Sequence, residues 1–248
     1  MAGHSHAHNV LFRKTKSNVA RSKLFSKLAR EIIVASKMGL PDPEHNARLR
    51  AAVIAAKEQS MPKENIERAI KKGQGGDAES YDEIRYEGYG PGGVALIVEC
   101  LTDNRTRTAA DVRATFSKFG GALGDPNSVA FMFNRVGAIA YPKDKGSEDE
   151  MLEIALEVGA DECISDDEEH EFLTSPESFA TVRDALEAKL GAPTSSGILF
   201  RPQNTVAVKD DTGETLIKLI DTLDDLDDVQ RVTGNYELSA ALMAKLEG

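Results

Sequence analysis

Residues 17–41, SNVARSKLFSKLAREIIVASKMGLP, set the pattern of the first part of the chain. Leu24, Leu28 and Ile32 recur every four residues, which places them on one side of an α-helix. The Gly39–Pro41 segment then ends the pattern, because glycine favours a helix C-terminus and proline cannot continue the helix. The stretch therefore predicts an amphipathic helix whose apolar side faces a core.

The opposite side of this helix, and the residues just before it, carry basic side chains with no acidic residue among them. Spacings of three and four residues, as in Lys23, Lys27 and Arg30, keep these charges on one face. Lys and Arg on one face neutralise phosphates and release counterions, which gives affinity without dependence on base sequence. We therefore expect a nucleic-acid interface here. Its candidate residues are Arg13, Lys14, Lys16, Arg21, Lys23, Lys27 and Arg30.

The net charge of the chain, -11, hides a strong asymmetry between two parts. Residues 1–73 contain 15 Lys and Arg against 6 Asp and Glu, a net +9, whereas residues 74–248 contain 15 against 35, a net -20. This division is typical of a nucleic-acid- or membrane-facing segment joined to a solvated acidic body. The alternative is that the basic segment docks on the acidic part of its own chain. Both interpretations hold if that acidic part competes with the polyanion for the basic segment.

Two further helices are expected before the character of the sequence changes. The second spans about residues 44–59, and the third begins at Pro62, because proline is well accommodated at the first helical position. Gly73 is expected to stop the third helix, and Gln74–Asp77 has the composition of a linker. The first part of the chain therefore predicts a basic bundle of three helices.

Strand patterns begin after this linker and alternate with helical ones. Val94–Leu101 is a continuous apolar run of buried-strand length, and Val129–Phe133 and Gly137–Tyr141 alternate as strands do. Residues 147–150, SEDE, form a capping box that opens a helix. The order of elements predicts the α+β class, with two units of the split βαβ kind after the helical bundle.

Two loops have a composition that suggests an anion site. Residues 102–108, TDNRTRT, join a strand to a helix and place Arg105 and Arg107 near a helix N-terminus, where anions bind readily. Capping and local turn chemistry explain the same residues equally well. Residues 88–93, GYGPGG, lack both the Gly-Lys-Ser/Thr of a P-loop and the GxGxxG spacing. We interpret them as a tight turn.

No catalytic or cofactor-binding set is recognisable in the sequence. GxSxG, HExxH and CxxC motifs are absent, and Cys100 and Cys163 are expected to be buried thiols. His4, His6 and His8 have a spacing that suits a metal, but adventitious binding or none is the better interpretation. We expect no resident metal, no cofactor and no small-molecule substrate.

The chain has no sequence signal for a membrane or for export. No apolar run approaches the roughly 18 residues of a membrane-spanning helix. The first ten residues, MAGHSHAHNV, have no apolar core of the signal-peptide kind. We therefore expect a cytoplasmic protein without a membrane partner, and we expect it to be a monomer.

Long motifs throughout the chain resemble the YebC/PmpR family. In the helical part they are MAGHS (1–5), RSKLFSKLAREI (21–32), DPEHNARLRA (42–51) and MPKENIERAIKKG (61–73). In the remainder they are EGYGPGGVA (87–95), LTDNRTRT (101–108), DVRATFSKFGG (111–121), GALG (121–124) and KLIDTLDDLDDVQRV (218–232). The resemblance spans nearly the whole sequence.

The resemblance implies an elongated fold of three domains, the third inserted in the second, so that the C-terminal segment returns to complete domain two. The expected domains are residues 1–76, residues 77–134 with 205–248, and residues 135–204. The family is described as bacterial DNA-binding transcriptional regulators. Similar proteins, including the mitochondrial translational activator of cytochrome oxidase, act in translation on the ribosome. The resemblance implies no cofactor and no reaction.

The sequence departs from the family pattern at two places. The family usually continues GHS with Lys-Trp, whereas His6-Ala7 stand here and an indole able to stack on a base is missing. Asp125-Pro126-Asn127 replaces a Gly-rich turn, which puts the geometry of that turn in doubt.

The sequence thus predicts a non-catalytic, nucleic-acid-binding regulatory factor, in the first place a DNA-binding transcriptional regulator. The alternative is a ribosome-associated factor that binds ribosomal RNA and relieves stalled translation. No clear base-reading helix of the kind used by sequence-specific DNA binders is recognisable. An enzyme with an unrecognised site is the least favoured possibility.

Overall fold

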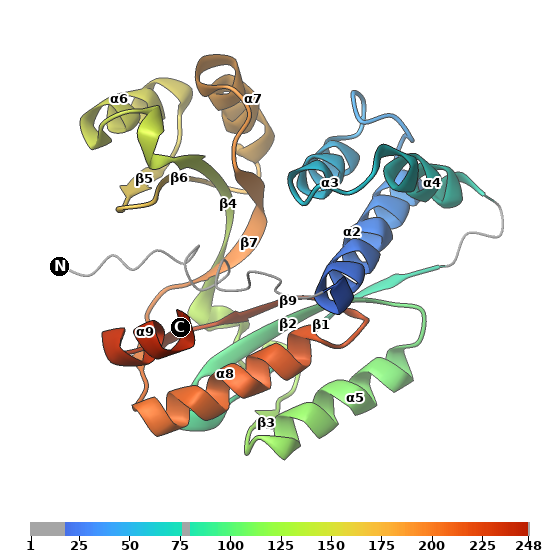
Figure 1. Ribbon diagram of the computed structural model, residues 1–248, viewed down its shortest axis with the longest axis vertical. Coiled ribbons are helices and arrows are strands. Elements are labelled where there is room, and N and C mark those ends of the chain that lie inside the picture. Colours follow the sequence, from blue (N-terminus) through green and yellow to red (C-terminus); the bar gives the residue numbers. More distant parts are fainter. Residues whose placement is uncertain (1–17, 76–79, 248) are drawn as a thin grey trace.

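The computed structural model describes residues 18–75 and 80–247, and these form a helical bundle and two antiparallel sheets (Figure 1). Each four-stranded sheet is covered on one side by two helices, as Figure 1 shows. The predicted α+β class is confirmed, with an N-terminal bundle of three helices followed by two α+β domains.

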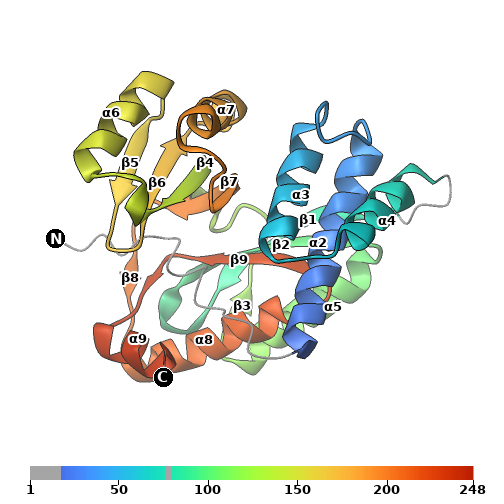
Figure 2. The same ribbon diagram turned by 45° about the horizontal axis from the view of Figure 1, so that its top comes forward.

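The helical bundle consists of α2 (Asn18–Met38), α3 (Ala47–Glu58) and α4 (Lys63–Gln74). The residues of α2 that are buried in the apolar core of the bundle lie between Ile32 and Ala35. The N-terminal half of α2 extends beyond the other two helices toward the first sheet (Figure 2). One helix therefore belongs to the bundle at one end and contacts the next domain at the other.

Gly73 lies in the last turn of α4, which ends at Gln74, one residue beyond the predicted stop. A Cβ atom at this position would lie 2.6 Å from the carbonyl oxygen of Ile33 and 2.8 Å from Cβ of Ser36. Both atoms belong to α2. The glycine is needed for the close approach of the two helices rather than for helix termination.

The first sheet has the strand order β3-β1-β2-β9 and combines segments that are far apart in the chain. Its strands are β1 (Asp82–Tyr89), β2 (Ala95–Thr102), β3 (Ala122–Leu123) and β9 (Val229–Gly234). The helices on its covered face are α5 (Arg105–Lys118) and α8 (Asp210–Asp224). Val98, Phe116 and Leu219 are part of the apolar core between sheet and helices. Since β9 pairs with β2, the C-terminal segment returns to complete the domain begun by β1.

Three smaller elements complete this domain. A short parallel pair is formed by β8 (Val206–Ala207) and β10 (Tyr236–Glu237), and α9 (Ala240–Glu247) follows. The GYGPGG segment is the predicted turn, and η1 (Pro91–Gly93) lies within it. Gly92 and Gly93 have φ of 79° and 75°, a conformation that residues with a side chain rarely adopt.

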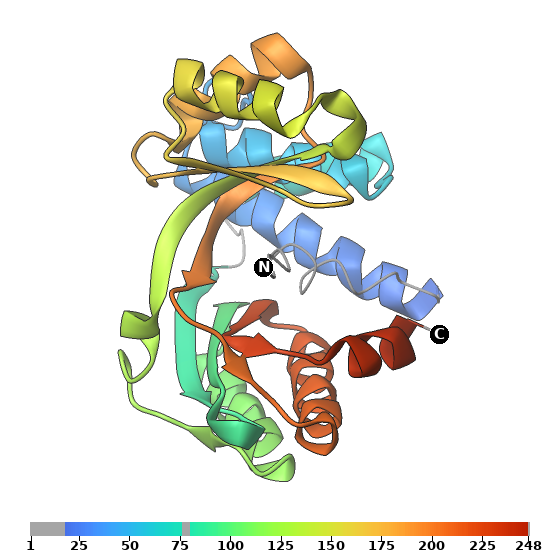
Figure 3. The same cartoon turned by 90° about the vertical axis from the view of Figure 1, so that its left-hand side faces the viewer.

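The second sheet has the order β5-β6-β4-β7. Its strands are β4 (Phe133–Pro142), β5 (Glu162–Ser165), β6 (Glu169–Thr174) and β7 (Ser195–Pro202). A short helix, η3 (Lys143–Lys145), is followed by the covering helices α6 (Glu148–Val158) and α7 (Phe179–Leu190). Ser147 and Glu150 form the predicted capping box of α6. Figure 3 shows β4 and β7 side by side, leading from the second sheet toward the first.

The predicted strand over Val129–Phe133 is wrong. The segment contains the short helix η2 (Ala130–Met132), and only Phe133 belongs to a strand. The buried carboxylate of Glu87 on β1 accepts the backbone N–H groups of Val129 and Ala130 at 2.9 and 2.8 Å. Because these amides are bound to a side chain, they do not take part in a strand ladder.

Asn127 adopts a left-handed backbone conformation of the kind that glycine usually supplies. Its φ is 67°, and asparagine is among the few non-glycine residues that tolerate this region. Its Oδ1 accepts a hydrogen bond of 3.0 Å from Nη2 of Arg85. The departure from the family pattern is therefore accommodated locally.

The two cysteines differ in burial. Cys100 on β2 is buried as predicted, but Cys163 is only half-buried, because β5 is an edge strand of its sheet. Burial raises the pKa of Cys100 to about 12 and that of Cys163 to about 11. Both thiols are therefore protonated at neutral pH and are weak nucleophiles.

Glu169, the first residue of β6, has a buried carboxylate oxygen, Oε1, without a hydrogen-bond partner in the described part of the chain. Burial, and the nearby carboxylates of Glu171, Asp166 and Glu168, raise the pKa of Glu169 to about 7 from its ordinary value of 4.5. A carboxyl group whose pKa is raised on folding destabilises the folded state as pH rises from the lower value to the higher.

We expect Glu169→Gln to raise the free energy of unfolding at pH 8 by on the order of 1 kcal/mol and to give no gain at pH 4. Urea denaturation at both pH values measures this. Glu153→Gln, at an exposed position of α6 whose carboxylate is not among those that raise the pKa of Glu169, is the matched control and should give no gain at either pH. Equal stability of Glu169→Gln and the unaltered protein at pH 8 would contradict the raised pKa.

Candidate nucleic-acid interface

The basic side of α2 faces the loop between α8 and β9. Lys23, Lys27 and Arg30 follow one another at four- and three-residue spacing and lie on one side of the helix. The facing loop is Asp224-Asp225-Leu226-Asp227-Asp228, which we call the acidic loop (residues 224–228). Each of the three basic side chains reaches it.

Both lysines contact the C-terminal end of α8. Nζ of Lys23 lies 3.2 Å from Oδ1 of Asp225 and 3.3 Å from the carbonyl oxygen of the same residue. Nζ of Lys27 lies 3.2 Å from Oδ1 of Asp224 and 2.5 Å from its carbonyl oxygen. A helix leaves its last carbonyl groups without partners, and carboxylates there are unfavourable unless cations are close. The lysines of α2 supply those cations.

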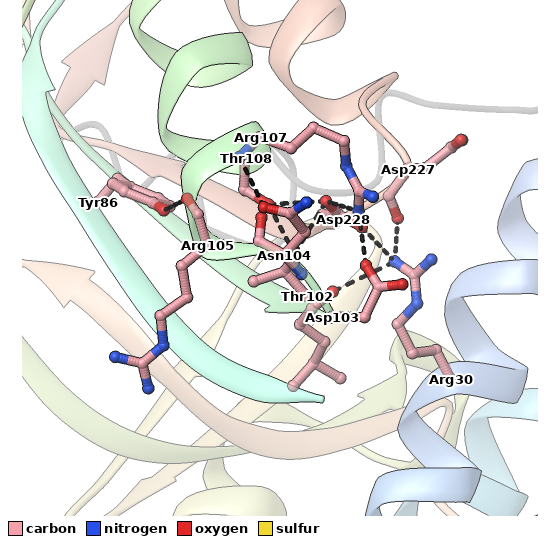
Figure 4. Close-up of polar contacts among 11 residues, drawn as sticks. Arg30, Tyr86, Thr102, Asp103, Asn104, Arg105, Arg107, Thr108, Asp227 and Asp228 are labelled. Atoms are coloured by element: carbon pink, nitrogen blue, oxygen red, sulfur yellow. Dashed lines mark hydrogen bonds and ion pairs between the residues drawn. The ribbon is translucent and has the colours of Figure 1, made fainter. Parts of the chain in front are cut away.

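Arg30 connects α2 with both the acidic loop and the first sheet (Figure 4). Its Nη1 donates to the carbonyl oxygens of Asp227 and Leu101, the latter at 3.3 Å, and lies 3.5 Å from Oδ1 of Asp228. The guanidinium also lies over the ring of Tyr81, 5.2 Å from its centre. Its side chain is 17 % exposed. Lys27, at 13 % exposed, is as enclosed as Arg30, but the carboxylate partner of Arg30 is the more buried of the two, with Asp228 at 7 % against 27 % for Asp224.

Asp228 is the buried acceptor at the centre of the cluster in Figure 4. Its Oδ2 accepts from Nη2 of Arg107 at 2.7 Å, from Oγ1 of Thr108 at 2.7 Å and from Oγ1 of Thr102 at 3.1 Å. Burial acts to raise the pKa of Asp228, but these hydrogen bonds outweigh it and hold the pKa below its ordinary value. The carboxylate is therefore charged at neutral pH and holds Arg30 and Arg107 near one another.

The TDNRTRT segment caps α5. Oδ1 of Asn104 accepts the backbone N–H of Arg107 at 3.0 Å, and Oγ1 of Thr102 accepts that of Asn104 at 2.9 Å. This is the capping chemistry weighed as an alternative to an anion site. The segment serves the local structure, and it also places Arg107 beside Asp228.

The other predicted residues lie away from the acidic loop or outside the described part of the chain. Arg105 pairs with Asp82, with 2.8 Å between Nε and Oδ2, and Figure 4 shows its guanidinium pointing away from Asp228. Arg21 is exposed, and its guanidinium lies 5.7 Å from the centre of the Phe25 ring. The candidates outside the described residues are Arg13, Lys14 and Lys16, and the metal candidates His4, His6 and His8 also lie there.

The carboxylates of the acidic loop were missing from the residues predicted for the site. The signal was present, since four of five consecutive residues are Asp within one of the motifs shared with the family. Along the chain, however, 197 residues separate Lys27 from Asp224. The alternative that the basic segment docks on its own acidic part is confirmed for Lys23, Lys27 and Arg30.

A small pocket of about 160 Å³ lies between α2 and the acidic loop. Its lining residues are Lys23, Ser26, Lys27, Arg30, Asp225, Leu226 and Asp227. Among these, Leu226 alone has an apolar side chain. The contact is therefore held by charge and hydrogen bonds rather than by close apolar packing of the kind found inside the bundle.

The fold and the site define a class of protein in which a basic helical domain contacts an acidic loop of an α+β domain that carries a second, inserted α+β domain. Residues 5–76 match the family model described as TACO1/YebC protein N-terminal domain, and residues 81–236 match the model described as TACO1/YebC second and third domain. The chain belongs to the TACO1/YebC family, which confirms the resemblance seen in its motifs. Membership supports a regulatory, nucleic-acid-binding role in general terms.

The crystal structure of a conserved hypothetical protein from Aquifex aeolicus is similar to this chain. The two share 45 % sequence identity over 95 % of this chain and 98 % of that chain, with a TM-score of 0.85. The similarity thus extends over nearly the whole length of both chains.

No helix in residues 18–75 and 80–247 combines the length and apolar character needed to cross a membrane. Over the same ranges, no group of three or more His, Cys, Asp or Glu side chains is arranged to hold a metal ion.

Proposed function

We propose that this protein is a non-catalytic regulatory factor that binds nucleic acid through phosphate groups, with the N-terminal half of α2 as the principal contact. The observation that supports this is the way Lys23, Lys27 and Arg30 engage anionic and carbonyl oxygens along one side of the helix. Phosphate oxygens have the same acceptor chemistry, and Lys and Arg are the residues that usually bind them. The spacing on α2 suits a row of such oxygens.

Duplex DNA is the first candidate target, and the activity would be transcriptional regulation. The family model that matches residues 81–236 is labelled as a transcriptional regulator. Phosphate contacts position a protein on DNA but carry no sequence information. A regulator of this kind would choose its sites through DNA shape and deformability.

Ribosomal RNA is the second candidate, and the activity would be the relief of stalled translation. The observation that favours it is the division of charge between a basic bundle and a body of net -20. That body would repel duplex DNA outside the basic side of α2, whereas a ribosome offers RNA phosphates beside basic protein surfaces. RNA helices are also recognised mainly by shape and phosphate contacts.

We expect binding to a fluorescent 20-bp duplex to weaken steeply with salt. For three to four phosphate contacts, the slope of log affinity against log salt concentration should be about -2.7 to -3.6. Fluorescence anisotropy between 50 and 200 mM salt measures the slope. A slope near zero would remove phosphate contact from the mechanism.

The choice between the two targets needs separate measurements. Equal affinity for a promoter fragment and a scrambled duplex at about 150 mM salt would count against a sequence-specific transcriptional regulator. Absence from ribosomal fractions at low salt, in normal and in stalled cells, would rule out the translational role. Crosslinking in cells, with the bound RNA and DNA sequenced together, compares both targets in one experiment.

A further inference from the structure

We propose that the acidic loop is an internal competitor for nucleic acid, which occupies the basic side of α2 in the free protein and is displaced when phosphates bind. The inference rests on the proposed function of α2 and concerns the regulation of that same surface. The loop offers α2 carboxylate and carbonyl oxygens together, so each lysine is satisfied before any ligand arrives.

The contact has a loose end at Lys23 and a fixed end at Lys27 and Arg30, with the side chains of Lys27 and Asp224 13 % and 27 % exposed. At the loose end, the side chains of Lys23 and Asp225 are 38 % and 71 % exposed. At the fixed end, those of Arg30 and Asp228 are 17 % and 7 % exposed. Exposed ion pairs are weak and are screened by salt, whereas enclosed ones exchange poorly with solvent. Displacement therefore begins at Lys23, and the two enclosed pairs of Lys27 and Arg30 follow.

The architecture allows this displacement without loss of either domain. The fully buried core residues of α2 begin at Ile32. Phe25, Leu28 and Ala29 pack against that core only partly buried, so the basic side of the helix can leave the loop while the buried core of the bundle stays intact. The pocket between helix and loop is lined almost entirely by polar and charged side chains. Separation therefore exposes little apolar surface, and the main cost is the loss of ion pairs that phosphates then replace.

The C-terminal end of α8 carries negative charge that the contact with α2 offsets. Asp224 and Asp225 stand where the helix already carries a partial negative charge, and α8 has no basic residue in its last turn. Their repulsion is offset by Lys23 and Lys27 in the closed arrangement. Neutral side chains at these two positions would remove the negative charge of the competitor while leaving its carbonyl groups and its length unchanged.

The test is the double variant Asp224→Asn with Asp225→Asn, titrated into a fluorescent 20-bp DNA duplex and a fluorescent 20-nucleotide RNA. We expect roughly fivefold tighter binding than the unaltered chain at about 100 mM salt. We also expect the salt slope on the duplex to become more negative by about 0.9 for each lysine freed. In the unaltered chain, phosphates replace the carboxylates of the acidic loop at the lysines. Fewer counterions are therefore released overall than in the loop variant.

The matched control is Asp144→Asn with Asp167→Asn, which changes the net charge equally at two exposed positions of the third domain. Its affinity and slope should stay within twofold of the unaltered chain. If it tightens binding as much as the loop variant, the effect is one of net charge and the competitor role is wrong. If neither variant changes the affinity, the loop is a structural contact only.

Failure of the proposed function gives a different result. If neither the unaltered chain nor the loop variant binds either probe at low salt, α2 is not a nucleic-acid interface, and the competitor role falls with it. Circular dichroism and thermal unfolding establish that each variant is folded. Asp225→Asn alone, at a side chain that is 71 % exposed, is the second variant if the double substitution fails to fold, and it should tighten binding about twofold.

Discussion

Replacing Asp228 by Ala is expected to lower the free energy of unfolding by about 3 kcal/mol. Asp228 is buried, and its carboxylate accepts hydrogen bonds from Arg107, Thr102 and Thr108 while pairing with Arg30. Removing one partner of a buried, hydrogen-bonded ion pair leaves the others without an acceptor, which costs more than the pair itself contributes. Urea denaturation followed by circular dichroism measures the loss.

Asp227→Ala is the control for Asp228→Ala. Arg30 contacts Asp227 through its backbone carbonyl, which the substitution keeps. We therefore expect a change within about 0.5 kcal/mol at this position. Comparable losses for the two variants would show that the carboxylate of Asp228 is not the centre of the cluster.

The stabilising effect of Asp228 also has a defined pH dependence. Its pKa is lower in the folded protein than the ordinary value of 3.8. A carboxyl group of this kind stabilises the fold above the unfolded pKa, and the effect is lost as pH falls through the folded pKa. The stability difference between the unaltered chain and Asp228→Asn should therefore be constant from pH 5 to 7 and shrink below about pH 4.

The double variant Lys23→Glu with Lys27→Glu is expected to weaken nucleic-acid binding by about 10- to 100-fold at 100 mM salt. Two phosphate contacts are lost and two negative charges replace them. The new glutamates also face Asp224 and Asp225, so α2 is repelled from the acidic loop. Displacement of the loop alone would favour binding, so a large loss of affinity identifies the lysines themselves as the contact. Anisotropy with the same duplex and RNA probes measures it.

The matched control for this charge reversal is Lys143→Glu with Lys189→Glu. These lysines lie in the inserted domain, and the variant has the same change of net charge. Its affinity should fall by much less than that of the α2 variant. Unchanged binding by the α2 variant, with its fold intact, would remove this helix from the interface.

The sequence predicted those parts of the fold that depend on local patterns. The four-residue recurrence of Leu24, Leu28 and Ile32 was enough to predict α2, and Ser147 with Glu150 was enough to predict the start of α6. Both depend only on residues within one or two turns of helix. The predicted domain limits at residues 134 and 204 stay a prediction.

Local patterns were not enough where a distant residue decides the role or the conformation of a segment. Gly73 has the composition of a helix stop, but its role is set by the backbone of α2. Val129–Phe133 alternates like a strand, but Glu87 binds two of its amides. In both cases the competing interaction comes from another element, and no periodicity within the segment reveals it.

In the candidate site, too, local patterns were predicted and contacts with distant residues were not. A basic side on α2 follows from spacing alone, whereas its opposition to Asp224–Asp228 depends on the return of the chain to the first sheet through β9. Overall charge asymmetry suggested that self-docking was possible but did not locate it. Asp228 was missed because its importance comes from burial and from its four donors rather than from its type.

The long separation between α2 and its acidic partner has a consequence during biosynthesis. Lys27 and Asp224 are 197 residues apart, and chains are made at about 5–20 residues per second, so α2 leaves the exit tunnel roughly 10–40 s before the loop. The first sheet is also incomplete until β9 has been made. For that interval the nascent chain carries an uncovered cationic helix beside the RNA of the ribosome that is translating it.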